Sequence, residues 1–146
     1  MKSITIYTDG ACKKNPGNGG WAAIIRWGYD NDEELHGNEA NTTNNRMEMM
    51  ALIKALETLG NTPYEIDICS DSKYVINGLE KGWAKSWKKN NWHKYTGEEA
   101  KNKDLWERLL ELTALHKIHY HWIKGHAENK YNNRCDELAV MESKLI

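Results

Sequence analysis

Four acidic residues that are far apart in the sequence each lie close to the expected end of a strand or helix. They are Asp9, Glu48, Asp71 and Asp136. Carboxylates that converge without histidine or thiolate partners favour hard cations, and Mg²⁺ binds through a few carboxylates while it keeps waters and substrate phosphates. The four positions therefore predict a magnesium site that folding assembles.

A site of this kind has a defined chemistry. Two divalent ions about 3.5–4 Å apart can activate a water and stabilise the leaving oxygen of an in-line phosphoryl displacement, so the expected reaction is phosphodiester hydrolysis. Two plainer explanations stay open at this point. An aspartate before a glycine, as in Asp9-Gly10, is usually a turn former, and Glu48 and Asp136 could simply complement the dipoles of their helices.

Composition limits the class of protein. The 146 residues are 40% hydrophobic and 28% charged, with a mean hydropathy of -0.81, which predicts one domain, residues 1–146, that is large enough to bury a core. The formal net charge of -1 provides no global basic field. Any nucleic-acid surface must therefore come from local clustering of lysines and arginines.

Cysteine usage and hydropathy indicate the compartment. Cys12, Cys69 and Cys135 are odd in number and form no CxxC pair, so neither a disulfide framework nor a structural zinc site is expected. No apolar run approaches membrane-spanning length, and Met1 leads directly into a strand and not into a signal peptide. We expect reduced thiols, a cytoplasmic location and no membrane partner.

The elements that must position the carboxylates begin with a hairpin and a helix. Apolar and β-branched runs predict strands at residues 3–10, 21–27 and 34–40, of which the last is polar enough to be an edge. The short, turn-rich connection between the first two makes them antiparallel. Apolar residues at helical spacing from Met47 to Leu59 predict a helix with Glu48 in its first turn, residues 42–45 as N-cap candidates and Gly60 as its stop.

A parallel crossover follows. Residues 64–70 predict a strand that ends at Asp71, and residues 72–79 predict a short helix. The order strand, helix, strand places the strand 64–70 beside and parallel to the strand 3–10, so Asp9 and Asp71 emerge at one sheet edge, where ligands bind in open α/β sheets. The remaining expected elements are a helix from Asn102 or Asp104, a strand at 117–123, a loop at 124–129 and a helix from about Asn132 to Lys144, with Asp136 near its start.

Residues 81–103, which we call the handle, interleave tryptophans and a tyrosine with lysines. Lysines neutralise nucleic-acid phosphates, and aromatic rings can stack on sugars or bases. The plainer expectation for Trp83, Trp87 and Trp106 is that they pack the handle to the body of the protein.

Motifs along nearly the whole chain resemble, in order, those of the bacterial type 1 ribonucleases H, the ribonuclease HI family. Each motif is short, but the ordered set is specific. The motifs are Tyr7-Thr8-Asp9-Gly10-Ala11-Cys12 with Asn15-Pro16-Gly17, Thr42-Thr43-Asn44-Asn45-Arg46-Met47-Glu48, Asp71-Ser72 with Tyr74-Val75, Trp122-Ile123-Lys124-Gly125-His126-Ala127, and Asn132-Asn133-Arg134-Cys135-Asp136-Glu137-Leu138-Ala139.

The resemblance implies an α/β fold with a mixed five-stranded sheet flanked by helices and a basic helical handle. It implies that Asp9, Glu48, Asp71 and Asp136 bind two Mg²⁺ or Mn²⁺ ions and act as the catalytic quartet. The implied reaction is endonucleolytic cleavage of the RNA strand of an RNA–DNA hybrid, with 5′-phosphate and 3′-hydroxyl products. His126 resembles the family's mobile histidine, which assists proton transfer or product release.

Substrate contacts are also implied by the resemblance. Backbone groups around Cys12, with Asn15 and Asn45, resemble contacts to the minor groove and to 2′-hydroxyls. Thr43 and Asn44, at a helix start where free N–H groups favour anions, resemble part of a DNA phosphate pocket. Without the family, all five are ordinary turn or capping residues.

Further expected substrate-binding residues are Asn132 in the last motif and the handle lysines Lys85, Lys88 and Lys89. Lys73 is a departure. It follows Asp71-Ser72, where the family commonly has an amide side chain, and a lysine can donate hydrogen bonds but cannot accept them.

Two other functions fit part of the pattern. An integrase or transposase of the same superfamily needs the acidic cluster but has no use for a handle or for 2′-hydroxyl contacts. A catalytically silent hybrid-binding module would explain the handle, but it has no need to crowd like charges. We expect a monomeric enzyme whose partner is an RNA–DNA hybrid.

Overall fold

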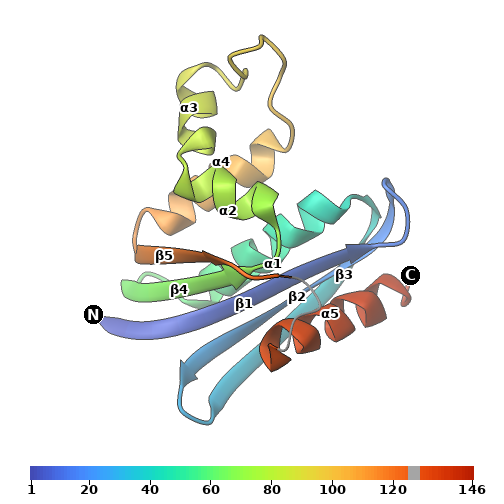
Figure 1. The fold of residues 1–146 in the computed structure, drawn as a ribbon. Helices are drawn as coiled ribbons and strands as arrows, with labels where there is room; N and C mark the ends of the chain where they lie inside the picture. The colour runs from blue at the N-terminus through green and yellow to red at the C-terminus, as the bar shows by residue number, and fades with distance from the viewer. Residues whose placement is uncertain (125–128) are drawn as a thin grey trace.

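The computed structural model describes residues 1–124 and 129–146 (Figure 1). Within these ranges the strands are β1 (Lys2–Cys12), β2 (Gly17–Gly28), β3 (Asn31–Thr42), β4 (Tyr64–Ser70) and β5 (Lys117–Trp122). The helices are α1 (Asn44–Thr58), α2 (Lys73–Glu80), α3 (Trp83–Lys89), α4 (Lys103–Thr113) and α5 (Lys130–Ser143). The strands form one five-stranded sheet in the order β3-β2-β1-β4-β5, which confirms the expected mixed sheet.

The way each pair of strands is connected explains its direction. β1, β2 and β3 follow one another through short turns and are antiparallel, whereas β4 returns through α1 and lies parallel to β1. β5 is parallel to β4 and closes one side of the sheet, and β3 closes the other as the predicted edge. The carboxyl ends of β1 and β4 therefore meet.

The first hairpin is longer than the sequence predicted. β1 continues through Cys12, and β2 already begins at Gly17, so the glycine-rich stretch predicted as loop is mostly strand. Gly20 shows why glycine is needed there, because a Cβ at this position would lie 2.1 Å from the Ala139 carbonyl oxygen of α5. The glycines allow close helix–strand packing rather than a turn.

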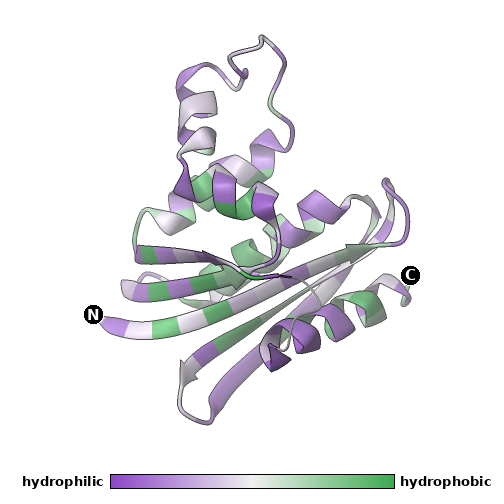
Figure 2. Cartoon of the chain, viewed as in Figure 1, coloured by the Kyte–Doolittle hydropathy of each residue, from purple (hydrophilic) through white to green (hydrophobic). Residues whose placement is uncertain are grey.

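Apolar side chains cover both faces of the sheet. On one face, residues of α1, α2 and α4 pack on Ile6, Ile25 and Ile68, and on the other face Leu138 and Ala139 of α5 pack on Ala22 and Ile24. Figure 2 shows apolar stretches along the inner strands and on the helices that cover them. No helix in the described ranges is long and apolar enough to cross a membrane.

The handle projects away from the sheet (Figure 1). Trp106 is fully buried, and Trp87 meets it edge-on with ring centroids 5.9 Å apart, which confirms that both tie the handle to the body. The same expectation was wrong for Trp83, which is 42% exposed and lies beside the Lys81 ammonium. Its position at the start of α3 directs it to solvent instead.

Candidate active site

The register of two parallel strands brings the first two carboxylates together. Thr8 of β1 pairs with Ser70 of β4. Asp9 and Asp71 directly follow these two residues in the sequence. Asp9 is 4% exposed, and its Oδ1 accepts a hydrogen bond of 2.9 Å from the Gly10 N–H. The predicted convergence at one sheet edge is therefore present.

Glu48 joins them because α1 lies directly against β1. A Cβ at Gly10 would be 2.6 Å from the Glu48 backbone nitrogen and 2.8 Å from the Met47 Cβ, so only glycine allows this approach. The expectation that Glu48 falls in the first turn of its helix was wrong. Thr43 is the N-cap, α1 begins at Asn44, and Glu48 lies in the second turn, where the helix dipole has little effect.

Asp9, Glu48 and Asp71, the acidic triad, each offer one oxygen within 4.8 Å of the other two. Burial, together with the charges of Asp71 and Asp136, raises the pKa of Asp9 to about 7. Burial and the Asp9 carboxylate likewise raise the pKa of Glu48 well above its ordinary value. Carboxylates in this situation hold their negative charge only at a free-energy cost.

The acidic triad fits a hard cation. Within the described ranges no lysine, arginine or histidine forms an ion pair with Asp9 or Glu48, and the buried Glu48 Oε2 has no hydrogen-bond partner. The donor atoms are all carboxylate oxygens, which suit Mg²⁺ or Mn²⁺ and not soft metals. A divalent ion would satisfy the orphaned oxygen and offset the repulsion.

Asp136 stands slightly apart. It lies in α5, which begins at Lys130, two residues before the expected start near Asn132, so Asp136 falls in the second turn of the helix and not at its start. Its carboxylate lies outside the group of oxygens within 4.8 Å, although its charge helps to raise the pKa of Asp9. All four carboxylates share one open hollow of about 400 Å³, the acidic hollow, which is lined by Asp9, Gly10, Asn44, Asn45, Glu48, Asp71, Ser72, Lys73, Tyr74 and Asp136.

The helix start that borders the acidic hollow is fixed by two side chains. The Thr43 Oγ1 accepts a hydrogen bond from the Arg46 N–H at 3.2 Å, and the Asn15 Oδ1 accepts one from the Asn44 N–H at 2.9 Å. Asn15, 29 residues earlier in the chain, therefore ties the β1–β2 turn to α1. Asn44 and Asn45 are exposed beside the acidic triad, where a ligand can reach them.

The other candidate substrate residues surround the hollow or lie on the handle. Lys73, the first residue of α2, is exposed and lines the hollow. The Cys12 thiol, at the end of β1, donates to the Lys14 carbonyl oxygen at 2.7 Å, and Asn132 is buried in α5 with an Oδ1 that has no partner among the described residues. Lys85, Lys88 and Lys89 are exposed on α3, outside the hollow. The expected residue His126 falls outside the described residues.

Sequence reasoning missed two residues that hold this region together. The Arg46 guanidinium donates to both Asp104 carboxylate oxygens, at 3.1 and 2.8 Å, and so joins α1 to α4. Trp122 contacts residues on both sides of Ser72, namely Asp71 and Lys73. Only the pairing of β5 with β4, which sets Trp122 opposite Ser70, could have drawn attention to Trp122.

Comparisons with known proteins agree with this geometry. The family model described as RNase H matches residues 1–144. A protein named Ribonuclease H from Chlorobaculum parvum is 50% identical over 143 residues, covering 98% of this chain and 97% of its relative. One of the same name from Acetivibrio thermocellus is 51% identical over 144 residues, covering 99% and 97% respectively.

Solved structures share the fold. LC9-RNase H1, described as a type 1 RNase H with the type 2 active-site motif, superposes with a TM-score of 0.87 at 24% identity, over 99% of this chain and 73% of that one. LC11-RNase H1, solved in complex with an RNA/DNA hybrid, superposes with a TM-score of 0.74 at 25% identity, over 97% of each chain. With the family model matched over almost the whole sequence and relatives half identical to it, this chain belongs to the RNase H family.

Proposed function

We propose that the protein is an endoribonuclease that hydrolyses the RNA strand of RNA–DNA hybrids, with residues 1–146 as a single catalytic domain. The observation that carries this proposal is the acidic triad, in which the buried Asp9 and Glu48 form no ion pair with a cationic side chain within the described ranges and the Glu48 Oε2 has no hydrogen-bond partner. Family membership supports the same reaction, as does a structural neighbour solved with an RNA/DNA hybrid.

Asp9, Glu48 and Asp71 would hold Mg²⁺, or Mn²⁺ in its place, and Asp136 would complete the set from the rim. Two such ions, when bound, activate a water and stabilise the leaving oxygen, which gives 5′-phosphate and 3′-hydroxyl ends. Asp9 and Glu48 must release the protons that burial favours before they can serve as ligands.

Other residues bind and orient the hybrid. Asn44 and Asn45 offer exposed side chains at the start of α1, beside the acidic triad, and Asn45 also offers its backbone N–H, to a sugar or phosphate. Asn15, by holding α1 at Asn44, keeps these groups in place. Cys12, whose Sγ lies 3.5 Å from the Thr42 carbonyl oxygen, and Asn132, on the same helix as Asp136, are the further candidate contacts. Contacts of this kind select RNA through its 2′-hydroxyls in the wide minor groove.

The groups farther from the acidic triad have simpler roles. Lys85, Lys88 and Lys89 are exposed on α3 and bind phosphates of the uncut strand. His126 assists proton transfer or product release. Lys73 binds a phosphate, because its ammonium is a point charge that suits phosphate oxygens.

Cleavage of labelled duplexes tests the proposal. We expect the protein to cut the RNA of an RNA–DNA hybrid in Mg²⁺, to stop in EDTA, and to leave RNA–RNA and DNA–DNA duplexes intact. The Asp9→Asn protein, prepared identically, is the control for a contaminating nuclease. Cleavage or strand transfer on DNA alone, with hybrid left intact, would overturn the assignment in favour of an integrase-like enzyme.

A further inference from the structure

Trp122, the last residue of β5, contacts the acidic hollow through two different parts of its side chain. Its indole Nε1–H donates a hydrogen bond of 2.9 Å to the Asp71 carbonyl oxygen. Its ring also faces the Lys73 ammonium, whose nitrogen lies 4.7 Å from the ring centroid. The side chain is 46% exposed, so core packing does not account for this arrangement.

The segment that carries Asp71 is held mainly from β5. The Ile123 N–H donates to the Ser70 carbonyl oxygen at 2.9 Å, and the Ser72 N–H folds back onto the Ser70 Oγ at 3.0 Å. Trp122 adds the bond to the carbonyl of Asp71 itself. The orientation of the Asp71 peptide plane sets the direction in which the Asp71 side chain leaves the backbone. By fixing that plane, the indole helps to fix the geometry of the acidic triad.

Lys73 is an exposed lysine, and such side chains ordinarily sample many rotamers. A ring face within about 6 Å of an ammonium restricts that freedom through cation–π attraction. Lys73 lines the same hollow as Asp9, Glu48 and Asp71, so the ring keeps a positive charge beside a cluster of negative ones. An anionic group that enters the hollow meets this cation first.

We propose that Trp122 is a positioning residue that fixes Asp71 and Lys73 relative to one another, and that Lys73, held in this way, binds a backbone phosphate of the strand entering the hollow. This inference rests on the proposed function, because it takes the hybrid as substrate. An ammonium is a point charge that pairs with phosphate oxygens, whereas an amide side chain both donates and accepts hydrogen bonds. Lysine at this position therefore favours recognition of backbone charge.

Hybrid binding in EDTA tests the pairing without any cleavage. Anisotropy of a fluorescein-labelled RNA–DNA hybrid is measured over a salt series for the wild type, Lys73→Met, Trp122→Leu and the double variant. We expect Lys73→Met to weaken binding about tenfold and to shallow the slope of log affinity against log salt by about 0.7–0.9. Trp122→Leu should weaken it about two- to fivefold, and the double variant should bind no more weakly than Lys73→Met alone.

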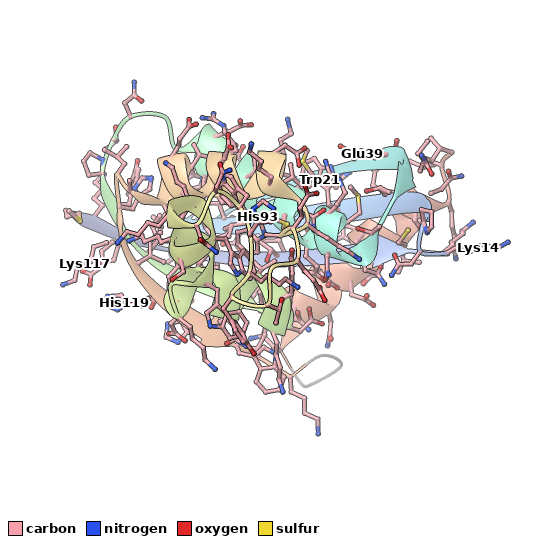
Figure 3. All side chains as sticks on the ribbon, turned by 90° about the horizontal axis from the view of Figure 1, so that it is seen from above. Lys14, Trp21, Glu39, His93, Lys117 and His119 are labelled. Carbon is pink, nitrogen blue, oxygen red and sulfur yellow. The ribbon has the colours of Figure 1, made fainter. Side chains whose placement is uncertain are left out.

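Lys117→Met is the matched control. Lys117 is the first residue of β5, at the opposite end of that strand from Trp122, and in Figure 3 it lies at the end of the molecule opposite Lys14. It should bind and cleave hybrid as the wild type does. Purely additive effects of Lys73→Met and Trp122→Leu on binding would show that the ring does not hold the lysine, and would overturn the inference.

Cleavage separates the two contacts of the indole. Trp122→Phe keeps an aromatic face for Lys73 but loses the N–H, so kcat should fall about tenfold with a nearly unchanged KM. Lys73→Met should raise KM and leave kcat nearly unchanged. A Trp122→Phe protein that keeps the wild-type kcat, and whose circular dichroism spectrum shows that it is folded, would refute the positioning of Asp71 by Trp122.

Failure of the wild type to cut hybrid would refute the proposed function instead. The binding measurements on the single and double variants would still decide whether Trp122 holds Lys73.

Discussion

The protein buries carboxylates in two places and surrounds them differently. Glu142 of α5 is 6% exposed, but its oxygens accept a hydrogen bond of 2.7 Å from the Asn38 Nδ2 and pair with the His36 Nδ1 on β3. The hydrogen bond from His36 holds the pKa of Glu142 below its usual range. Burial instead raises the pKa values of Asp9 and Glu48 above theirs.

The contrast separates a structural carboxylate from a ligand-binding one. Glu142 has its partners in the fold and fastens α5 to the edge of the sheet, so folding satisfies its charge. Asp9 and Glu48 are left for a partner that comes from outside, because no cation of the described chain pairs with either of them. Burial alone does not identify an active site, whereas burial of a carboxylate without a cationic partner points to one.

The largest expected effect is the loss of hydrolysis on changing the acidic triad. Asp9→Asn removes a ligand charge with almost no change in volume, so we expect cleavage of hybrid to be abolished while the fold is retained. Glu142→Gln is the matched control at the other buried carboxylate and should retain cleavage. Substantial Mg²⁺-dependent turnover by Asp9→Asn protein would show that Asp9 is no more necessary for cleavage than Glu142, and would contradict the assignment of the acidic triad as the metal site.

The pH dependence of stability sharpens the comparison. The pKa of Asp9 is about 7 in the folded protein and about 3.9 in an unfolded chain, so the folded state binds the proton more tightly. Without metal, the free energy of unfolding should therefore fall by about 2–4 kcal/mol as the pH rises from about 4 to about 7. Urea unfolding in EDTA measures this fall, which should be smaller in Asp9→Asn protein. Mg²⁺ should restore stability at pH 8 and not at pH 5.

A candidate catalytic group that is not expected to bind metal should matter less than the acidic triad. His126→Ala should lower kcat by about 10²-fold, the scale of a lost acid–base or release contribution, and should leave measurable cleavage. Single-turnover and steady-state rates distinguish proton transfer from product release. Complete loss of activity with unchanged metal binding would place His126 among the indispensable groups.

Exposed charges on the handle give a smaller effect of a different kind. Alanine at Lys85, Lys88 and Lys89 removes phosphate contacts that are equal in ground and transition states, so KM should rise about tenfold with an unchanged kcat. The salt slope should shallow by about 0.7–0.9 for each lost contact. A variant with alanine at Lys2, Lys54 and Lys117 carries the same charge change away from the hollow and should keep the parental KM. Equal behaviour of the two triple variants would show that the handle lysines are merely solvated.

The smallest effect is expected at Glu142. Glu142→Gln should lower the free energy of unfolding at pH 7 by about 1–2 kcal/mol, because it weakens the bond to His36. The loss should vanish as the pH falls below about 4, since a lowered folded-state pKa contributes stability only above the unfolded pKa. Thermal unfolding across this range measures the change. An equal loss of unfolding free energy at pH 3 would mean that the substitution acts through packing and not through the charge of Glu142.

Chain order and local chemistry predicted most of the fold and much of the site. Asp9 and Asp71 follow strands whose parallel pairing is required by the intervening helix, so their meeting could be deduced. The start of α1 could not be deduced, because residues 42–45 are four consecutive residues of types that commonly cap helices. Thr43 is selected as the N-cap with help from Asn15, 29 residues away, and this places Glu48 one turn later than expected.

Contacts between side chains that are distant in the sequence could not be predicted from the sequence alone. The Asn129 side chain caps α5 by accepting from the N–H groups of Tyr131 and Asn132, which starts the helix early and places Asp136 well inside it. The contact of Lys73 with Trp122 depends on rotamers and on strand register together. Periodicity predicts which face a residue occupies but not which partner it meets there.

The central place of β1 bears on hydrogen exchange. Residues Thr5 to Thr8 of β1 are paired with β2 on one side and with β4 on the other, so their amides exchange with water only when the sheet itself comes apart. Asp9 directly follows this doubly paired stretch and pairs with Ala22 of β2, so its repulsion from Glu48 is borne by the cooperative unit to which the stretch belongs. Amide exchange along β1 should report global unfolding, and added Mg²⁺ should slow it by the full stabilisation that binding provides.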